Sequence, residues 1–429
     1  MSKPPNRRPW WQRWPLGPYA GPYLLLLSLL AALLPAAGFK DDFWLWVRWA
    51  EYSRAHGLGN AYAVPGNNYN PLYHYILWLF GRLAGSAEAI EAQRYSLKLL
   101  TLPFDVGGAL LAASLAGPAR RRFVGSLWLL LNFGYLYNTL IWGQVDAIYT
   151  GLSFGAVVLA LRDRGTWSAV CFALALAAKL QALIFLPPLL LLWAPRWWQR
   201  PRLLPAALLA GLVTLGLVLL PFVVGGERGY LTDIWRINRQ AVGYYSVLSM
   251  NAYNWWHLTA GGLLLTRPDT DLWHGLSYRH WGMLLFAVAA TAVLLPLLLH
   301  ALARLRRPRP ADRPLVLLTF ALVPLVFCFF NTQMHERYWH AALLFAGAYA
   351  FVRRRYALLM LVSGAYLLNL EAVFGYLQLR ALLPGLLHPQ LVALLFAGAI
   401  ALGLLELYRH APLGPAIRAL LKQGAPSHA

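Results

Sequence analysis

Long apolar runs recur along the chain from Tyr19 to Tyr408. They are continuous stretches of Leu, Ala, Val and Phe, whereas the strands of a membrane β-barrel alternate apolar and polar positions over roughly 10 residues. A helix needs about 20 apolar residues to cross the hydrocarbon core. The pattern therefore predicts an all-α, polytopic transmembrane protein of about twelve spans, give or take two. These predicted spans cover residues 19–37, 97–117, 123–140, 147–161, 166–180, 182–195, 203–224, 281–303, 314–330, 339–352, 356–370 and 390–408.

Composition excludes an ordinary soluble enzyme. Of the 429 residues, 59% are hydrophobic and 12% are charged, whereas soluble domains carry about 25% charged residues. The net charge of +21 would suggest nucleic acid as the partner of a soluble protein. Here no basic segment lies beside a soluble module that could dock on a duplex, so we expect no nucleic-acid partner. Cys171 and Cys328 lie inside apolar runs, and we interpret them as packing residues.

The first apolar run, 19–37, follows a basic start and ends in small residues, as a signal peptide does. It is longer than the usual signal core of about 7 to 15 residues, and many spans follow it. We therefore predict that it is retained as the first span.

Lys and Arg are distributed unequally between the two sides of the predicted spans. Of the 37 Lys and Arg residues, 23 fall on one side, and such residues favour cytoplasmic loops. The chain is therefore predicted to have both ends in the cytoplasm and two long extracytoplasmic loops, 38–96 and 225–280. The basic side includes the tail residues Lys3, Arg7, Arg8 and Arg13 and the arginine clusters at 120–122, 304–313 and 353–355.

The first long loop opens with two carboxylates, Asp41 and Asp42. Apolar side chains then follow at helical spacing, which predicts an interfacial helix over 43–52. The carboxylates have two interpretations. They stabilise the positive end of the helix dipole, or one of them is a general base whose pKa is raised by partial desolvation at the lipid boundary.

An aromatic segment, Tyr69 to Tyr75, precedes an apolar stretch that ends near Arg82. The stretch 71–85 is shorter than a span, and counting it as one would move Arg120 to Arg122 to the outer side. We predict that it is interfacial or re-entrant.

Asp105 and Lys179 lie inside apolar runs. A charge there costs at least about 2.5 kcal/mol and usually faces a cavity or a partner. A structural ion pair explains either residue. We assign Asp105 to architecture and Lys179 to function, because Gln181 follows Lys179 and the pair Pro187-Pro188 breaks the next run.

Two short polar segments lie at span ends on the side of the long loops. The first, Trp142 to Asp146, is either a simple turn or part of a site. The second, Met334 to Tyr338, has an unusual density of charge. His335 and His340 are one position too far apart for a zinc-protease pair on one helical face. Arginine supplies a fork of donors with permanent charge, so this segment is better suited to holding a phosphate.

Taken in order, these segments resemble the GT-C superfamily of membrane glycosyltransferases, and more narrowly its bacterial mannosyltransferases related to the GPI-anchor enzymes. More distantly, they are similar to the lumenal glucosyltransferases of N-glycan assembly. Asn70 and Leu180 stand where many relatives have proline, and the last spans match nothing specific. The segments that carry the resemblance are Asp42 to Ala50, Tyr69 to Tyr73, Trp142 to Asp146, Lys179 to Gln181 and Met334 to Tyr338.

The resemblance implies inverting transfer of a hexose from a polyprenyl-phosphate sugar to an acceptor hydroxyl at the outer face of a bacterial inner membrane. Mannose is the hexose it favours. One carboxylate suffices, because phosphate leaves without protonation, whereas glycosidases need two. The spacing to Trp49-Ala50 favours Asp42 as the base, with Asp41 shaping its field. His335, Arg337 and Lys179 supply cations for the phosphate. The implied substrate-binding residues are Tyr69, Tyr73, Gln144, Asp146, Lys179, Gln181, His335, Glu336 and Arg337.

The implied partners are the lipid-linked donor, a glycan, glycolipid or protein acceptor, and membrane lipids. No cofactor is expected, and a divalent metal is allowed but not indicated. We divide the chain into a basic cytoplasmic tail at 1–18, a catalytic membrane module at 19–352, and variable C-terminal spans with a tail at 353–429.

Two rival functions stay open at this point. A transporter or flippase for a lipid-linked sugar would also place Asp105 and Lys179 in the membrane, although the sequence has no internal repeat and no matching pair of broken helices. A noncatalytic assembly subunit is the second rival.

Overall fold

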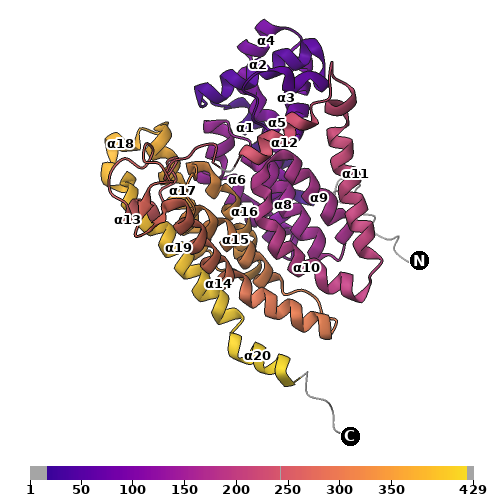
Figure 1. Ribbon diagram of the computed structural model, residues 1–429, viewed down its shortest axis with the longest axis vertical. Coiled ribbons are helices and arrows are strands. Elements are labelled where there is room, and N and C mark those ends of the chain that lie inside the picture. The colour runs from indigo at the N-terminus through magenta and orange to yellow at the C-terminus, as the bar shows by residue number, and fades with distance from the viewer. Residues whose placement is uncertain (1–16, 242, 423–429) are drawn as a thin grey trace, which may run out of the picture.

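The computed structural model describes residues 17–241 and 243–422, and these are predominantly helical (Figure 1). Most of the predicted tail at 1–18 lies outside the described residues. One short antiparallel hairpin is present, β1 (Leu272–Trp273) with β2 (Leu276–Ser277), in the register Leu272↔Ser277. The prediction of an all-α polytopic membrane protein is confirmed.

Seven helical stretches in the described chain are long and apolar enough to cross a membrane. Three shorter apolar helices accompany them, α1 (Ala20–Ala32), α8 (Asp146–Leu161) and α9 (Gly165–Ala178). The count of about twelve spans therefore stays a prediction. The long stretches contain α5 (Lys98–Ala113), α10 (Leu186–Gln199), α11 (Leu203–Val224), α14 (Tyr278–Arg306), α15 (Arg313–Phe330), α17 (Ala357–Phe374) and α19 (Pro389–His410).

Two predicted spans differ from the helices observed. The run 19–37 is α-helical only as far as Ala32, where α1 ends. The run 123–140 is broken, because α6 (Ala119–Leu130) ends before Asn132, whose side chain accepts a hydrogen bond from the Tyr135 N–H and so starts a new helix. That new segment comprises α7 (Phe133–Leu136) and the π-helix η5 (Tyr137–Trp142).

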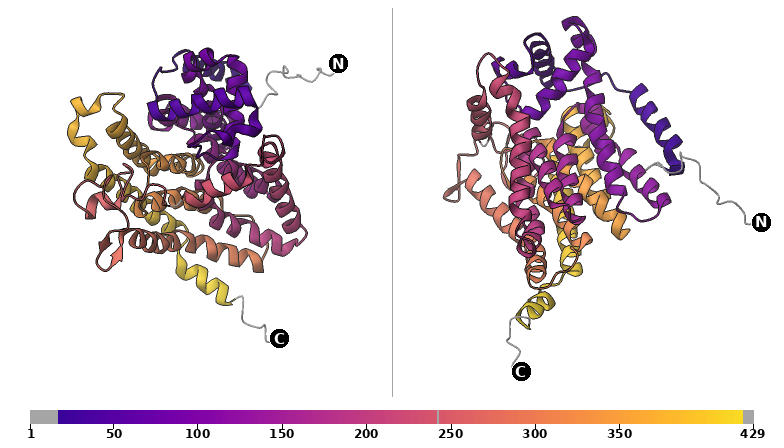
Figure 2. Two further views of the ribbon diagram at one scale, coloured as in Figure 1. Left: turned by 45° about the horizontal axis from the view of Figure 1, so that its top comes forward. Right: turned by 90° about the vertical axis from the view of Figure 1, so that its right-hand side faces the viewer.

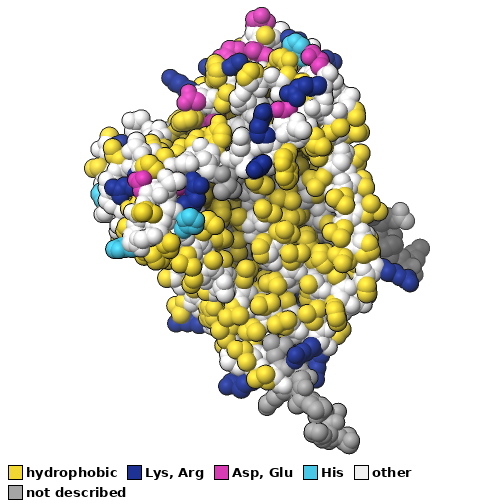
Figure 3. Space-filling view, viewed as in Figure 1, with side chains coloured by type: hydrophobic (Ala, Val, Ile, Leu, Met, Phe, Trp, Pro, Cys, Tyr) yellow, Lys and Arg dark blue, Asp and Glu magenta, His cyan; other side chains and the backbone are white. Residues whose placement is uncertain are grey.

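The helices α15 and α16 (His340–Arg353) form the centre of the bundle, since almost every residue from Leu315 to Phe329 and from His340 to Phe351 is buried. A helix that is apolar on all sides is expected to lie in such a position. By contrast, only 17% of the apolar window of α11 and 22% of that of α14 is buried. These two helices therefore present their apolar side chains outward, where lipid would contact them (Figure 3).

The first helix packs at the edge of this bundle. Tyr19 stacks on Phe123 with ring centroids 4.3 Å apart, and the Tyr23 hydroxyl lies 2.7 Å from Ser126 Oγ in α6. Figure 2 (right) shows α1 beside α6 and connected to the rest of the chain by an extended linker.

The first long loop is largely helical and caps one end of the bundle (Figure 1). The helix predicted over 43–52 is observed as part of α2, and its interfacial position stays a prediction. The helix α3 has 14 residues, too few to cross a membrane, as predicted. The elements here are α2 (Lys40–His56), η3 (Leu58–Ala63), α3 (Pro71–Ala84), α4 (Ala87–Ala92) and η4 (Arg94–Leu97).

The second long loop folds back over the end of α15. Met250 N–H and Ala252 N–H both donate to the Met334 carbonyl, at 2.9 and 3.2 Å. The buried Asp269 accepts hydrogen bonds from Arg279, Thr332 and Gln333. Between the helices this loop contains α12 (Leu231–Gln240) and α13 (Trp255–Thr259).

The C-terminal region belongs to the same core. Asn369 on α17 accepts hydrogen bonds from Tyr253 N–H and Trp339 Nε1 at 3.0 and 3.1 Å, and its amide donates to the Asn251 carbonyl at 2.8 Å. It therefore fixes both the second loop and the 3-10 turn η7 (Glu336–Trp339). The remaining elements are η2 (Gly17–Tyr19), η6 (Leu180–Phe185), α18 (Leu379–Leu382), η8 (Pro384–Leu387) and α20 (Leu413–Lys422).

The bundle has two chemically different ends. In the view of Figure 3 an apolar band separates an upper end, which carries acidic, basic and histidine side chains, from a lower end whose visible charges are Lys and Arg. The helix α8 connects the two ends, from Asp146 to the turn at Asp163, and its 16 residues correspond to about 24 Å. The candidate site lies at the Asp146 end.

Candidate functional site

A buried carboxylate, Asp146, joins two cations from distant parts of the chain. Lys179 Nζ lies 2.5 Å from Asp146 Oδ1, and Arg337 Nε lies 3.9 Å from Asp146 Oδ2. Asp146 begins α8, Lys179 separates α9 from η6, and Arg337 lies in η7. A buried charge is stable only when it is paired, so this carboxylate holds the three segments together.

Asp42 lies on the first turn of α2 beside this group. Its Oδ2 accepts a hydrogen bond from Gln144 Nε2, and it is partly exposed, whereas Gln144 and Asp146 are fully buried. Burial raises the pKa of Asp42, and the charges of Arg337 and Lys179 oppose that rise. The carboxylate is thus accessible and more basic than an ordinary aspartate.

A residue that the sequence did not single out, Lys98, fixes the approach to Asp42. Its Nζ donates to the carbonyls of Pro35, Ala37 and Leu140 at 2.9, 2.5 and 2.6 Å. Two of these carbonyls lie in the linker before α2, and the third lies in η5 just before Gln144. The Lys98 side chain is 1% exposed, so it acts as a clip that sets the linker against the segment carrying Gln144.

Gly143 allows α2 to approach this segment closely. Its φ of +88° is left-handed, and a Cβ at this position would lie 2.4 Å from Phe43 Cε2. Phe43 directly follows Asp42, and the Phe39 N–H also donates to the Trp142 carbonyl at 3.0 Å. Glycine is therefore required by both the backbone conformation and the contact.

The segment from His335 to Arg337 carries two N–H groups with no hydrogen-bond partner in the described chain, His335 Nε2 and Arg337 Nε. Arg337 Nη1 lies 3.1 Å from Glu336 Oε1 and 3.2 Å from His335 Nδ1. Because an arginine nitrogen can only donate, His335 Nδ1 accepts this bond and the ring proton lies on Nε2. Arg337 Nε faces Asp146 Oδ2 at 3.9 Å without a hydrogen bond, so both N–H groups are buried donors suited to an anion.

The cation role expected for His335 is not supported. Burial lowers its pKa well below the usual range, and the neighbouring charges of Arg337 and Lys179 lower it further. Desolvation disfavours the charged form of Arg337, but the carboxylates of Glu336, Asp42 and Asp146 keep its pKa above the usual value. His335 is therefore a neutral donor beside a permanent cation.

Aromatic side chains form a wall beside the two carboxylates. The Tyr69 ring lies 5.5 Å from Trp49, 6.1 Å from Trp46 and 5.4 Å from Tyr73. Asn70 Nδ2 donates to the Leu176 carbonyl at 3.0 Å, which ties this segment to the end of α9 near Lys179. The wall thus connects the first loop to the cations.

The second long loop adds Tyr245, which the sequence did not single out. Its ring lies 5.1 Å from that of His335, and its side chain is 41% exposed. Tyr338 lies beside the same cations, with Lys179 Nζ 5.1 Å from its ring centroid. The adjacent aromatic pair Tyr244-Tyr245 was the only sequence signal for this contribution.

The other predicted residues lie as follows. Asp41 is exposed on the surface of α2, and Gln181 lies beside the Tyr338 hydroxyl. Asp105 lies with His340, Oδ1 to Nε2 3.5 Å, in the buried core, which fits the architectural role assigned to it. In the described residues no group of three or more His, Cys, Asp and Glu side chains is placed to hold a metal ion.

Comparison with known proteins adds a family relationship. Residues 69–330 match the sequence profile of glycosyltransferase family 87. This match includes Tyr69, Gln144, Asp146 and Lys179 but leaves out Asp42 and the 335–337 segment.

Two curated relatives, from Mus musculus and Homo sapiens, are each named Dol-P-Man:Man(5)GlcNAc(2)-PP-Dol alpha-1,3-mannosyltransferase. Each is 33% identical over 103 residues, which is 24% of this chain and 23% of the relative. The similarity thus spans less than a quarter of the relatives' length. The narrower resemblance to the GPI-anchor enzymes stays a prediction.

Replacing Lys98 by methionine should destabilise the protein, because three carbonyls lose their donor while the side-chain volume is kept. We expect a loss of about 2 kcal/mol in the free energy of unfolding, measured as a lower midpoint of denaturation in detergent. The matched control is Lys40→Met, since Lys40 is exposed at the start of the same α2. Equal midpoints for the two variants would contradict the clip.

Proposed function

Because the chain belongs to glycosyltransferase family 87, we propose that it transfers a hexosyl group from a polyprenyl-phosphate sugar to an acceptor hydroxyl. Mannose is the proposed hexose. The names of the mouse and human relatives, which specify Dol-P-Man and a mannosyltransferase, support this choice of donor class and sugar. The observation that carries the proposal is the accessible Asp42 carboxylate beside the Asp146, Lys179 and Arg337 group.

Asp42 acts as the general base. One carboxylate oxygen is held by Gln144, and the other is free to take the proton of the acceptor hydroxyl as that oxygen attacks the anomeric carbon. The bond from the anomeric carbon to the phosphate oxygen breaks, and the phosphate leaves with the electron pair. Attack opposite to the leaving group inverts the anomeric configuration. A second acid is unnecessary, because phosphate is a good leaving group.

Asp146 is better suited to positioning than to proton transfer. It is fully buried and faces Lys179 and Arg337 with both oxygens. The different environments of the two aspartates thus give them different roles: Asp42 is the base, and Asp146 orients the cations.

The donor phosphate is held by Arg337, Lys179 and the neutral His335. Arg337 Nε and His335 Nε2, which make no hydrogen bond within the described chain, donate to the phosphate. The two cations stabilise the charge that develops on the leaving phosphate. Tyr69, which is partly exposed, offers a ring face to the sugar or the prenyl chain, and the buried Tyr73 packs behind it. No step here requires a metal ion.

The end of the bundle that carries this site faces the outside. The opposite end is rich in arginine, and positive charge favours the cytoplasmic side. Family membership favours sugar transfer over the transporter or flippase alternative, and a bacterial inner membrane is the proposed location.

We expect Asp42→Asn to lower turnover by about 10² to 10⁴ while donor binding is kept, because the change removes basicity and preserves size. Transfer of radiolabel from polyprenyl-phosphate mannose to membrane acceptors measures turnover. In the wild type, activity should be lost as the pH falls through the raised pKa of Asp42, since a base must be deprotonated. Near-normal turnover in Asp42→Asn would move the base to another carboxylate.

The matched variant is Asp41→Asn. The negative charge of Asp41 helps raise the pKa of Asp42, so its removal should shift the acid limb of the rate profile to lower pH and retain most of the maximal rate. An acid limb unchanged by Asp41→Asn would contradict the proposed electrostatic coupling.

Arg337→Lys should raise the donor KM roughly tenfold or more, because a charged, forked hydrogen bond is worth about 1.5–3 kcal/mol and lysine cannot reproduce its geometry. The measurement is donor-dependent kinetics on protein that elutes as a monodisperse peak in detergent. Arg82→Lys, an exposed position on α3, is the control. Unchanged donor kinetics in a folded Arg337→Lys protein would overturn the phosphate assignment.

Orientation can be measured by cysteine labelling in a Cys171→Ala, Cys328→Ala background. Pro65→Cys and Thr270→Cys lie at exposed positions of the two long loops, and Pro308→Cys lies at an exposed position of the arginine-rich end. We expect an impermeant maleimide to label the first two in intact cells and the third only after permeabilisation. The reverse pattern would overturn the proposed orientation.

A further inference from the structure

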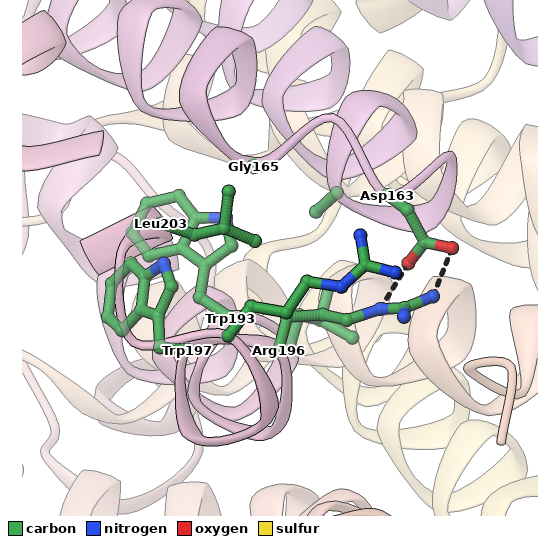
Figure 4. Close-up of a pocket in the computed structure, with 9 residues that line it drawn as sticks. Asp163, Gly165, Trp193, Arg196, Trp197 and Leu203 are labelled. Carbon is green, nitrogen blue, oxygen red and sulfur yellow. Dashed lines mark hydrogen bonds and ion pairs between the residues drawn. The ribbon is translucent and has the colours of Figure 1, made fainter. Parts of the chain in front are cut away.

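A second candidate site lies in a hollow at the arginine-rich end of the bundle (Figure 4). It lies between the turn that joins α8 to α9 and the turn that joins α10 to α11. Figure 4 shows Trp193, Trp197 and Leu203 on one side of the hollow and Asp163 with Arg196 on the other. The lining residues are Ala160, Asp163, Gly165, Leu192, Trp193, Arg196, Trp197, Arg200 and Leu203.

One arginine in the hollow is already paired. Arg196 Nε donates to Asp163 Oδ1 at 2.6 Å, and Arg196 Nη2 pairs with Asp163 Oδ2. The two-point contact fixes the Arg196 side chain across the turn and satisfies the one carboxylate that lines the hollow.

A second arginine has no such partner. Arg200 is one helical turn after Arg196, and its guanidinium makes no hydrogen bond or ion pair with any residue of the described ranges, 17–241 and 243–422. Arg200 and Arg202 also line the adjoining hollow with Pro201 and Leu203. The two adjoining hollows therefore have a net positive charge, and the N–H donors of the Arg200 guanidinium have no partner in the described ranges.

The other lining side chains are typical of the membrane interface. The Trp193 and Trp197 rings lie 5.3 Å apart, and Trp193 Nε1 donates to Ser168 Oγ at 3.0 Å, which orients the ring. Trp198 and Trp167 nearby are 73% and 63% exposed. Tryptophan is enriched where the headgroups meet the hydrocarbon, and this supports placing the hollow at headgroup depth.

The hollow is separate from the proposed active site. Asp146 and Asp163 lie at opposite ends of α8, about 24 Å apart by helix length. Likewise Lys179 and Gly165 lie at opposite ends of α9. The phosphate of a donor bound at the Asp42 end therefore lies too far from Arg200 to contact it.

We propose that the hollow binds the phosphate headgroup of an anionic phospholipid from the leaflet at the arginine-rich end. Arg200 contacts the phosphate, and Arg196 is held in place by Asp163 to shape the wall. The partly exposed Trp197 and Leu203 pack against the glycerol and upper acyl chain. Basic pockets between transmembrane helices bind anionic headgroups in this manner, and arginine is suited to phosphate because of its planar fork of donors.

The test is native mass spectrometry of the full-length protein in detergent, titrated with palmitoyl-oleoyl phosphatidylglycerol or with the matching phosphatidylcholine. We expect the wild type to retain phosphatidylglycerol preferentially and Arg200→Gln to bind it about fivefold more weakly. Arg200→Lys, which keeps the charge and loses the fork, should give an intermediate loss. Arg121→Gln, an exposed arginine on α6 outside the hollow, should bind as the wild type does.

Three results would overturn the proposal. One is equal phosphatidylglycerol binding by wild type and Arg200→Gln. Another is equal weakening by Arg200→Gln and Arg121→Gln, which would indicate diffuse charge attraction. The third is displacement of the lipid by millimolar inorganic phosphate, which would make the hollow a site for free phosphate. Elution profiles of each variant before lipid addition establish that the variants are folded.

Discussion

The arrangement of the proposed active site depends on one buried charge, Asp146. A carboxylate in an apolar bundle is tolerated only with partners, and its partners here come from the α9–η6 junction and from η7. The ion pairs therefore determine where three otherwise separate segments meet. Leaving either Lys179 or Arg337 without Asp146 would strand a cation among buried side chains.

Around this charge the fold gives similar residues different roles. Asp42 and Asp146 are both aspartates near the same cations, but one is partly exposed with a raised pKa and the other is buried between its partners. His335 and Arg337 are two residues apart, yet burial keeps the histidine neutral while the surrounding carboxylates keep the arginine charged. The environment of each group, more than its type, supports its proposed chemistry.

The two ends of the bundle complement one another. Three helical stretches run from the proposed active site to the arginine-rich hollow. They are α8, α9, and η6 together with α10. One end concentrates carboxylates, cations and aromatic rings around the proposed active site. The other presents arginine and tryptophan, residue types that favour a lipid headgroup region. A single helical core thus carries both proposed sites, one at each end.

The sequence by itself determined the fold class, because uninterrupted apolar runs in a chain with few charges admit only membrane helices. It also singled out Asp42, Gln144, Asp146, Lys179 and Arg337 as candidates, because polar groups at span ends stand out and because their segments resemble GT-C motifs. Only the tertiary structure showed that these five come together, and that Lys98, Asn369 and Tyr245 position or border them. Those three act through contacts with carbonyls, loops and rings from distant segments, and such contacts leave no periodic pattern along a chain. The break at Asn132 was hidden for the same kind of reason, because a single side-chain cap ended a helix inside an otherwise continuous apolar run.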